Sequence, residues 1–182
     1  MAVIFDRSVW EKRAWRRFKS ALQRGVPDRE ATDGWTTDVR AIEGIARAVE
    51  WCDGRKINVQ FSKKEGGTYD HTTRTISIAG RCKPQLQLHY LLHECGHALI
   101  GERTTTGRFS KGYSQLAVHP GAERLNEHRL DVLEEEFEAW HRGWRLGLRI
   151  GSLSEDDRDT YNMTRNRLVS TYVKWAARVK GW

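Results

Sequence analysis

Hydrophobic residues recur along the chain with two different periods, which divide it into helical and extended segments. Residues 8–24 and 36–51 carry apolar side chains at helical spacing, so each range predicts a helix that buries one face. Residues 56–62 instead alternate apolar and polar side chains, which indicates a half-buried strand. A second alternating segment, residues 67–79, has a polar stretch near its middle and predicts a short hairpin.

The second half of the chain returns to helical spacing. Pro84 suits a first helical turn and precedes a long apolar helix. Residues 101–120 are rich in Thr, Gly and Ser and predict a long loop, after which helical patterns resume over residues 122–148 and roughly 155–179. The pattern predicts an α+β fold in one domain, residues 1–182, with N-terminal helices (1–52), a central core (56–148) and a C-terminal helix (154–180).

Composition favours a globular protein of a reducing compartment. No run approaches the roughly 20 apolar residues that cross a bilayer, and Asp6 and Arg7 interrupt the apolar N-terminus, so we expect neither a membrane partner nor a signal peptide. The three cysteines, Cys52, Cys82 and Cys95, form no CxxC pair and predict neither a disulfide framework nor a zinc ribbon. A cytoplasmic location is the expectation.

The net charge of +7 is unevenly distributed. Residues 1–24 carry seven Lys or Arg residues against two acids, whereas residues 123–138 carry seven acids against two arginines. A basic helix can bind nucleic acid, and it can equally be a solvated surface helix. The residues that favour nucleic acid are Arg13, Arg16, Arg17 and Lys19 beside Trp10 and Trp15.

The strongest chemical signal is the motif His93-Glu94-Cys95-Gly96-His97 inside the apolar helix. Residues four apart lie on one helical face, so His93 and His97 can bind one ion, while Glu94 is displaced by about 100° and can act as a general base. Zinc suits two imidazoles with an open coordination position. A chain of this composition would contain roughly 0.02 such motifs by chance, so a metal site is favoured over two surface histidines.

Three neighbours of the motif invite separate predictions. His89 stands one turn before His93, too far along the axis to share the same ion, and is expected to be exposed or to support the ligands. Cys95 faces the apolar stripe and is expected to be buried. Gly96 predicts the close approach of another backbone, for which the sheet is the natural partner.

A site with two histidines needs a third protein ligand. The metzincin continuation is excluded, because Ile100 and Arg103 stand where that class has glycine and histidine. The residues alone leave the choice open among His119, His128, His141, Glu134, Glu135, Glu136 and Glu138.

The order of these motifs resembles a known family. A strand, a hairpin with "GTYD" and "TRTISI", the stretch "LLHECGHAL" and then a Glu-rich helix look like the compact gluzincin-type metallopeptidases of the ImmA/IrrE family, with SprT-like proteases next, over roughly residues 57–145. The resemblance implies a zincin-like fold in which a small, mostly antiparallel sheet packs on the HExxH helix. It also implies that the third ligand lies in an E-x-E-A motif, which points to Glu138, with Glu134 as its main competitor.

The expected function is therefore a zinc-dependent metallopeptidase. Glu94 would take a proton from the attacking water and pass it to the leaving amine, while the hairpin would offer its free edge to an extended protein substrate. Tyr113, His119 and His128 are candidates for stabilising the oxyanion. The alternatives are a nucleic-acid-associated protein and a zinc-stabilised module without activity.

Overall fold

The computed structural model describes residues 6–62, 66–103, 109, 112–113 and 125–178. These residues form an α+β structure that is mostly helical. In chain order the elements are α1 (Arg7–Gln23), α2 (Asp28–Asp53), β1 (Asn58–Ser62), β2 (Gly67–Asp70), β3 (Thr75–Ala79), α3 (Pro84–Arg103), α5 (Asn126–Arg149), the 3₁₀ turn η2 (Glu155–Asp157) and α6 (Arg158–Ala176).

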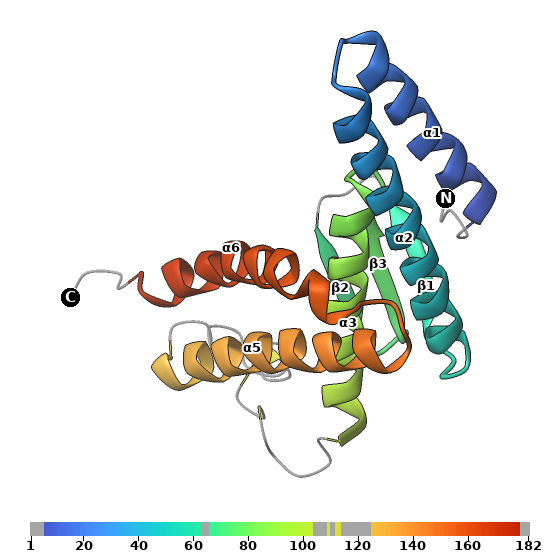
Figure 1. The fold of residues 1–182 in the computed structure, drawn as a ribbon. Coiled ribbons are helices and arrows are strands. Elements are labelled where there is room, and N and C mark those ends of the chain that lie inside the picture. The colour runs from blue at the N-terminus through green and yellow to red at the C-terminus, as the bar shows by residue number, and fades with distance from the viewer. Residues whose placement is uncertain (1–5, 63–65, 104–108, 110–111, 114–124, 179–182) are drawn as a thin grey trace.

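The second helix is longer than its apolar pattern predicts. It begins at Asp28 rather than near residue 36, because Pro27 fixes the N-terminal cap and two acids, Asp28 and Glu30, occupy the first turn near the positive end of the helix dipole. α1 and α2 run side by side as a helical hairpin at one end of the molecule (Figure 1). Trp10 of α1 is 3% exposed and packs against Phe61 of β1, which ties this hairpin to the sheet.

The sheet has three strands in the order β1-β3-β2 among the described residues. β2 pairs with β3 antiparallel, as the hairpin pattern predicts, but β1 pairs with β3 in parallel. The expectation of a mostly antiparallel sheet is therefore wrong, and the sheet is mixed. The physical reason is burial. Ile76 and Ile78 of β3 are fully buried, so this most apolar strand takes the centre and leaves β2 at an edge. β1 and β3 run in the same direction and β2 runs against them, so placing β3 beside β1 makes their pairing parallel.

Helix α3 is the centre of the structure. It packs on α2, α5, α6 and on strands β2 and β3, so almost every side of it is covered (Figure 1). This explains why apolar residues surround the helix instead of forming one stripe. Among the described residues, no helix combines the length and apolar character needed to cross a bilayer.

The crossing of α3 and α5 is unusually close because glycines stand at the contact. A Cβ added to Gly96 of α3 would lie 2.0 Å from the carbonyl oxygen of Ala139, and one added to Gly143 of α5 would lie 2.5 Å from the carbonyl oxygen of Leu92. The backbone that approaches Gly96 is therefore that of α5, not that of the sheet as the sequence suggested. Two helices can meet this closely only where no side chain separates them.

The cysteines are free thiols, as expected. Cys95 is fully buried, in agreement with its position on the apolar side of α3. Its sulfur lies 3.4 Å from that of Cys52, so the two thiols join α2 to α3 inside the core.

The α3–α5 crossing predicts the effect of two glycine substitutions. We expect Gly96→Ala to lower the free energy of unfolding by about 3 kcal/mol or more, because the added methyl group meets backbone that cannot move aside. Gly34→Ala is the matched control, since nothing lies within 4 Å of its added Cβ and it is exposed within α2. It should gain about 1 kcal/mol from helix propensity. Urea denaturation measures both, and equal stabilities for the two variants would contradict the close crossing.

Candidate metal centre

The two histidines of the motif lie side by side on α3. The Nε2 atoms of His93 and His97 are 3.3 Å apart, and each residue is 7% exposed. Both residues are buried between the helix and its neighbours, which is the arrangement that spacing of four residues predicts. With Glu94 they form a group whose ligand atoms lie within 4.8 Å of one another and could hold a metal ion.

Helix α5 brings a glutamate to the same two nitrogens. Glu136, 1% exposed, has Oε2 at 3.3 Å from His93 Nε2 and Oε1 at 3.5 Å from His97 Nε2. Two ligand atoms bound tetrahedrally at 2.0–2.1 Å from one zinc ion would be about 3.3 Å apart. The separation of the two imidazole nitrogens and the two separations from Glu136, one from each of its carboxylate oxygens, are all close to this value. Glu136 Oε2 also lacks a hydrogen-bond partner among the described residues, as a metal-binding oxygen would.

Glu135, which precedes Glu136, contacts the ring nitrogen of His97 that faces away from the ligand position. Its Oε1 lies 3.2 Å from Nδ1 of His97, and its side chain is buried. A carboxylate that accepts a hydrogen bond from Nδ1–H leaves the Nε2 lone pair facing the metal position and fixes the ring orientation. His93 is held differently, because its ring stacks on the Trp140 ring with centroids 4.4 Å apart.

Glu94 lies slightly farther from the ligand atoms. Its Oε1 is 4.0 Å from His93 Nε2, compared with 3.3 Å for Glu136, and it is 4% exposed. Burial raises the pKa of Glu94, whereas His93 and His97 lower it. Its position beside the ligand atoms, at a greater distance than Glu136, fits a proton acceptor better than a ligand.

The cluster holds a positive charge between its carboxylates. Burial alone would lower the pKa of His97, but hydrogen bonds with Glu135 and Glu136 raise it to about 10. Burial alone would raise the pKa of Glu136, but its contacts with His93 and His97 bring it well below the ordinary value. A metal cation would satisfy the same carboxylates, and its binding requires that His97 release this proton.

These groups line one pocket of about 230 Å³. Its opposite wall is the edge strand β2, where Gly67 faces Glu94 so closely that an added Cβ would lie 2.7 Å from Glu94 Oε1. Tyr113 lines the same pocket, as does Tyr172 from α6. The Tyr113 hydroxyl donates a hydrogen bond of 2.6 Å to Glu136 Oε1. Burial raises the pKa of both tyrosines, so both hydroxyls remain protonated donors at neutral pH.

Glu138, the ligand that the family pattern indicates, lies elsewhere. Its Oε1 accepts a hydrogen bond of 2.8 Å from Arg142 Nε, and the two residues line a separate pocket with Leu99. Residues two apart on a helix point about 200° from each other, so Glu136 and Glu138 cannot face the same histidines. Glu134 is exposed. The structure brings Glu136 to the histidines and does not bring Glu138 there.

The two described histidine candidates for the third ligand, His128 and His141, also lie away from the site. His128 is buried, but its ring meets Trp175 at 6.1 Å between centroids, and it lines a neighbouring apolar pocket that also contains Val132. His141 is exposed. His119 lies outside the described residues. Of the two described residues suggested for oxyanion stabilisation, Tyr113 lines the pocket and His128 does not.

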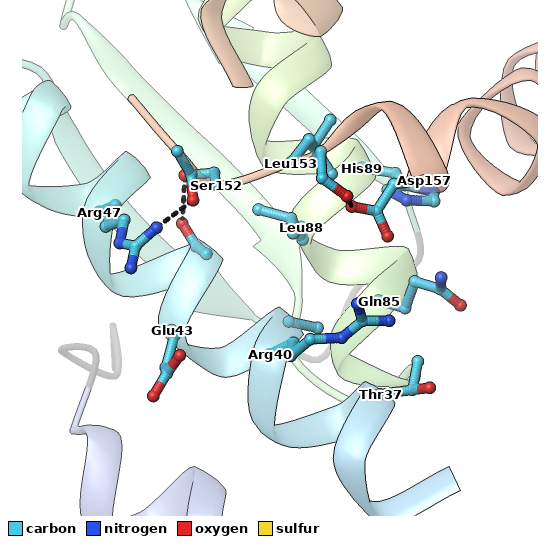
Figure 2. A pocket seen from close by; sticks show the side chains of 14 residues that line it. Thr37, Arg40, Glu43, Arg47, Gln85, Leu88, His89, Ser152, Leu153 and Asp157 are labelled. Atoms are coloured by element: carbon cyan, nitrogen blue, oxygen red, sulfur yellow. Dashed lines mark hydrogen bonds between the residues drawn. The ribbon is translucent and has the colours of Figure 1, made fainter. Parts of the chain in front are cut away.

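His89 is buried rather than exposed, which corrects one of the two expectations for it. It is 2% exposed and lines a different pocket, of about 190 Å³, between α2, α3 and the turn after α5 (Figure 2). Figure 2 shows His89 beside Asp157. The Thr164 hydroxyl donates to the Thr160 carbonyl, so its oxygen accepts the hydrogen bond of 2.9 Å from His89 Nδ1.

Tyr172 and His71 were not identified from the sequence, and Glu136 was named among the candidate ligands but not selected. The periodicity of α5 could have selected Glu136. It lies on the same buried helical face as Val132, Ala139 and Gly143, which are small or apolar residues. Tyr172 lies on α6, and the exposed His71 follows β2 and lines the pocket. No local pattern marks Tyr172 or His71, since only the tertiary fold brings them to the motif.

Comparison with known proteins gives no relative: the chain matches no protein-family model, no curated protein and no solved structure. The interpretation of the site therefore rests on its own geometry.

The geometry predicts an order of metal affinities among three variants of α5 and one variant of α3. With zinc as the probe ion, Glu136→Gln should show the largest loss of zinc affinity, because it removes a ligand. Glu135→Gln should bind zinc about 10- to 100-fold more weakly, because it removes the hydrogen bond that orients His97. Glu138→Gln should bind zinc like the unmodified chain, and so should His89→Gln. Competition titration with a chromophoric chelator measures all four. If Glu138→Gln lost zinc and Glu136→Gln retained it, the third ligand would be Glu138, as the family pattern indicates, and not Glu136.

Burial of His89 predicts a dependence of stability on pH. Burial lowers its pKa to about 4, with Asp157 opposing the shift, whereas the unfolded chain has the ordinary value of 6.5. The unfolded state therefore takes up the proton first, and stability should fall as the pH drops from 6.5 to 4 by up to about 3 kcal/mol for this group. His89→Gln should lose correspondingly less stability over the same interval. Urea denaturation of both metal-free proteins at the two pH values tests this, and equal losses would contradict it.

Proposed function

We propose that the protein is a zinc-dependent metallopeptidase. The observation that carries this proposal is the arrangement of His93, His97 and Glu136 at mutual distances of 3.3–3.5 Å, with Glu94 beside them and a sheet edge across the pocket. Two imidazoles and one carboxylate with an open position are the ligand set of hydrolytic zinc sites. The site could also hold another divalent ion, but imidazole-rich sets of this geometry favour zinc over magnesium or calcium.

A zinc ion held by these residues would supply Lewis acidity, polarising the scissile carbonyl and lowering the pKa of a coordinated water. The chain's own groups perform the proton transfers. Glu94 accepts a proton from the attacking water and donates it to the leaving amine nitrogen, which general acid–base catalysis by one carboxylate allows. Burial raises the pKa of Glu94, which makes it a better acceptor for this proton.

The two tyrosines have different roles in this proposal. The Tyr113 hydroxyl already donates to Glu136 and so holds that ligand in place. Tyr172 lines the same pocket, and we assign it the donation of a hydrogen bond to the oxyanion that develops on the substrate carbonyl. This assignment replaces His128, which lies in the neighbouring pocket.

Strand β2 provides the surface for an extended substrate. Among the described strands it has a neighbour on one side only, β3, and Gly67, Thr68 and Tyr69 line the pocket. A peptide added to this edge would gain backbone hydrogen bonds that do not depend on sequence. The substrate class is therefore a protein or peptide segment that is extended at the cleavage site.

The resemblance to the ImmA/IrrE family enters this proposal with one change. The HExxH helix, the hairpin and the acidic helix occur in the expected order, which supports a zincin-like arrangement. The third ligand that we propose is Glu136 rather than Glu138, at the first glutamate of the E-x-E-A sequence.

The proposed mechanism predicts the result of Glu94→Gln. Gln has nearly the shape of Glu, so the protein should fold and bind zinc, but it cannot accept the proton. We expect peptide hydrolysis to fall by 10²- to 10⁴-fold or more. Cleavage of unfolded protein substrates, followed by mass spectrometry and compared with the unmodified chain, measures the loss. Equal cleavage by both would remove Glu94 from the mechanism, and zinc binding without cleavage by either would indicate a zinc-stabilised module.

A second substitution tests the same proton acceptor without changing it. In Gly67→Ala the added methyl group would meet the end of the Glu94 side chain, which is flexible and should move. We expect zinc binding and stability to be nearly unchanged, with a loss of about 10-fold or more in kcat, because a displaced base transfers protons poorly. Gly66 has φ +83 and is unsuitable as a control, so Thr72→Ala serves instead, because Thr72 is exposed after β2 and does not line the pocket. Full activity in Gly67→Ala would contradict the role of this contact.

A further inference from the structure

The outward face of α1 carries a row of unneutralised positive charge. Lys12, Arg16 and Lys19 follow one another at spacings of four and three residues, so they lie on one face of the helix, and all three are exposed. We call these three residues the α1 stripe. None of them forms an ion pair with an acidic residue in the part of the chain that the structure describes.

Two of the three other basic residues of α1 form ion pairs with acids. Arg7 pairs with Glu11 and Glu43, and Arg17 pairs with Asp38 of α2. Glu11 is the one acid within α1, so no acidic side chain interrupts the stripe. The helix therefore pairs the charges that face α2 with acids. Arg13 and Lys19 instead lie over the rings of Trp10 and Trp15, each 5.2 Å from the ring centroid.

The opposite face of the helix is already used for packing. Trp10 and Ala14 are 3% and 1% exposed and join α1 to the core. This leaves a polar, basic surface outward, beside Trp15, which is 44% exposed. Such a face lacks the broad apolar surface that an interfacial membrane helix requires. The charge complement that it fits is a polyanion.

We infer that the α1 stripe binds the phosphate backbone of duplex DNA without sequence preference. From Lys12 to Lys19 the helix rises about 10 Å, a distance over which one strand of B-DNA presents about three phosphates. α1 lies at the outer side of the molecule (Figure 1), and the major groove of DNA is wide enough for a helix, whereas that of duplex RNA is too narrow.

DNA bound there would leave the metal centre accessible. α1 contacts the sheet at β1, through Trp10 and Phe61, whereas the metal pocket lies at β2 on the other edge. The DNA surface does not depend on the metal ligands or on Glu94, so Glu94→Gln should bind DNA like the unmodified chain. Failure of the peptidase proposal would therefore leave this inference standing, and the reverse also holds.

The test is the salt dependence of binding to a fluorescent 20-bp duplex. Three phosphate contacts should weaken binding about 40-fold between 50 and 200 mM salt, with correspondingly more loss if other groups also contribute. The triple variant Lys12→Gln, Arg16→Gln, Lys19→Gln should bind at least about 30-fold more weakly at 50 mM salt, and the slope of log K against log salt should fall by about 3.

The matched control removes the same charge elsewhere. Arg145, Arg149 and Arg167 are exposed on α5 and α6, and their triple replacement by Gln should leave the affinity within about threefold and the slope unchanged. Circular dichroism confirms that both triple variants fold. The inference is overturned if the unmodified chain does not bind the duplex at 50 mM salt, or if both triple variants lose affinity equally. Tighter binding to duplex RNA, or retention on anionic phosphatidylserine vesicles but not on DNA, would also overturn it.

Discussion

The close crossing of α3 and α5 is the constraint on which the candidate metal centre depends. Gly96 against Ala139, and Gly143 against Leu92, let the two backbones touch, and this sets the rotation and height of α5 relative to the HExxH helix. Glu136 lies about one turn before Ala139 on the same face, so it arrives at the level of His93 and His97. Glu135 then lies beside Nδ1 of His97 and can orient the imidazole ring. Two glycines thus decide which glutamate meets the histidines.

The sequence predicted the parts of this fold that local periodicity encodes. The helical segments, the hairpin and the pair His93 and His97 all follow from spacing within one segment. The parallel pairing of β1 with β3 did not follow, because it depends on which strand is most buried in the assembled sheet. The choice between Glu136 and Glu138 depends on which face of α5 meets α3, which the apolar period of α5 encodes but the family pattern does not. Tyr172 and His71 depend on tertiary placement alone.

The molecule separates two kinds of charge. Three acids, Glu94, Glu135 and Glu136, are buried around two histidines, while Lys12, Arg16 and Lys19 of α1 remain exposed. A net charge of +7 therefore underestimates how basic the outer surface of α1 is and how acidic the pocket is. The free edge of β2 lies at the acidic pocket, and the basic helix lies at the other edge of the sheet, so each surface can act without obstructing the other.

If the site binds zinc as proposed, the three buried carboxylates would also connect metal supply to the lifetime of the protein in a cell. Glu94, Glu135 and Glu136 are each 5% exposed or less, and carboxylates crowded in a low-dielectric pocket disfavour the folded state unless positive charge lies among them. Zinc bound only by the folded chain would stabilise it by mass action, more strongly as free zinc rises. Chains that lack zinc would open more often and meet housekeeping proteases, so zinc starvation would reduce the abundance of the protein as well as the occupancy of its site.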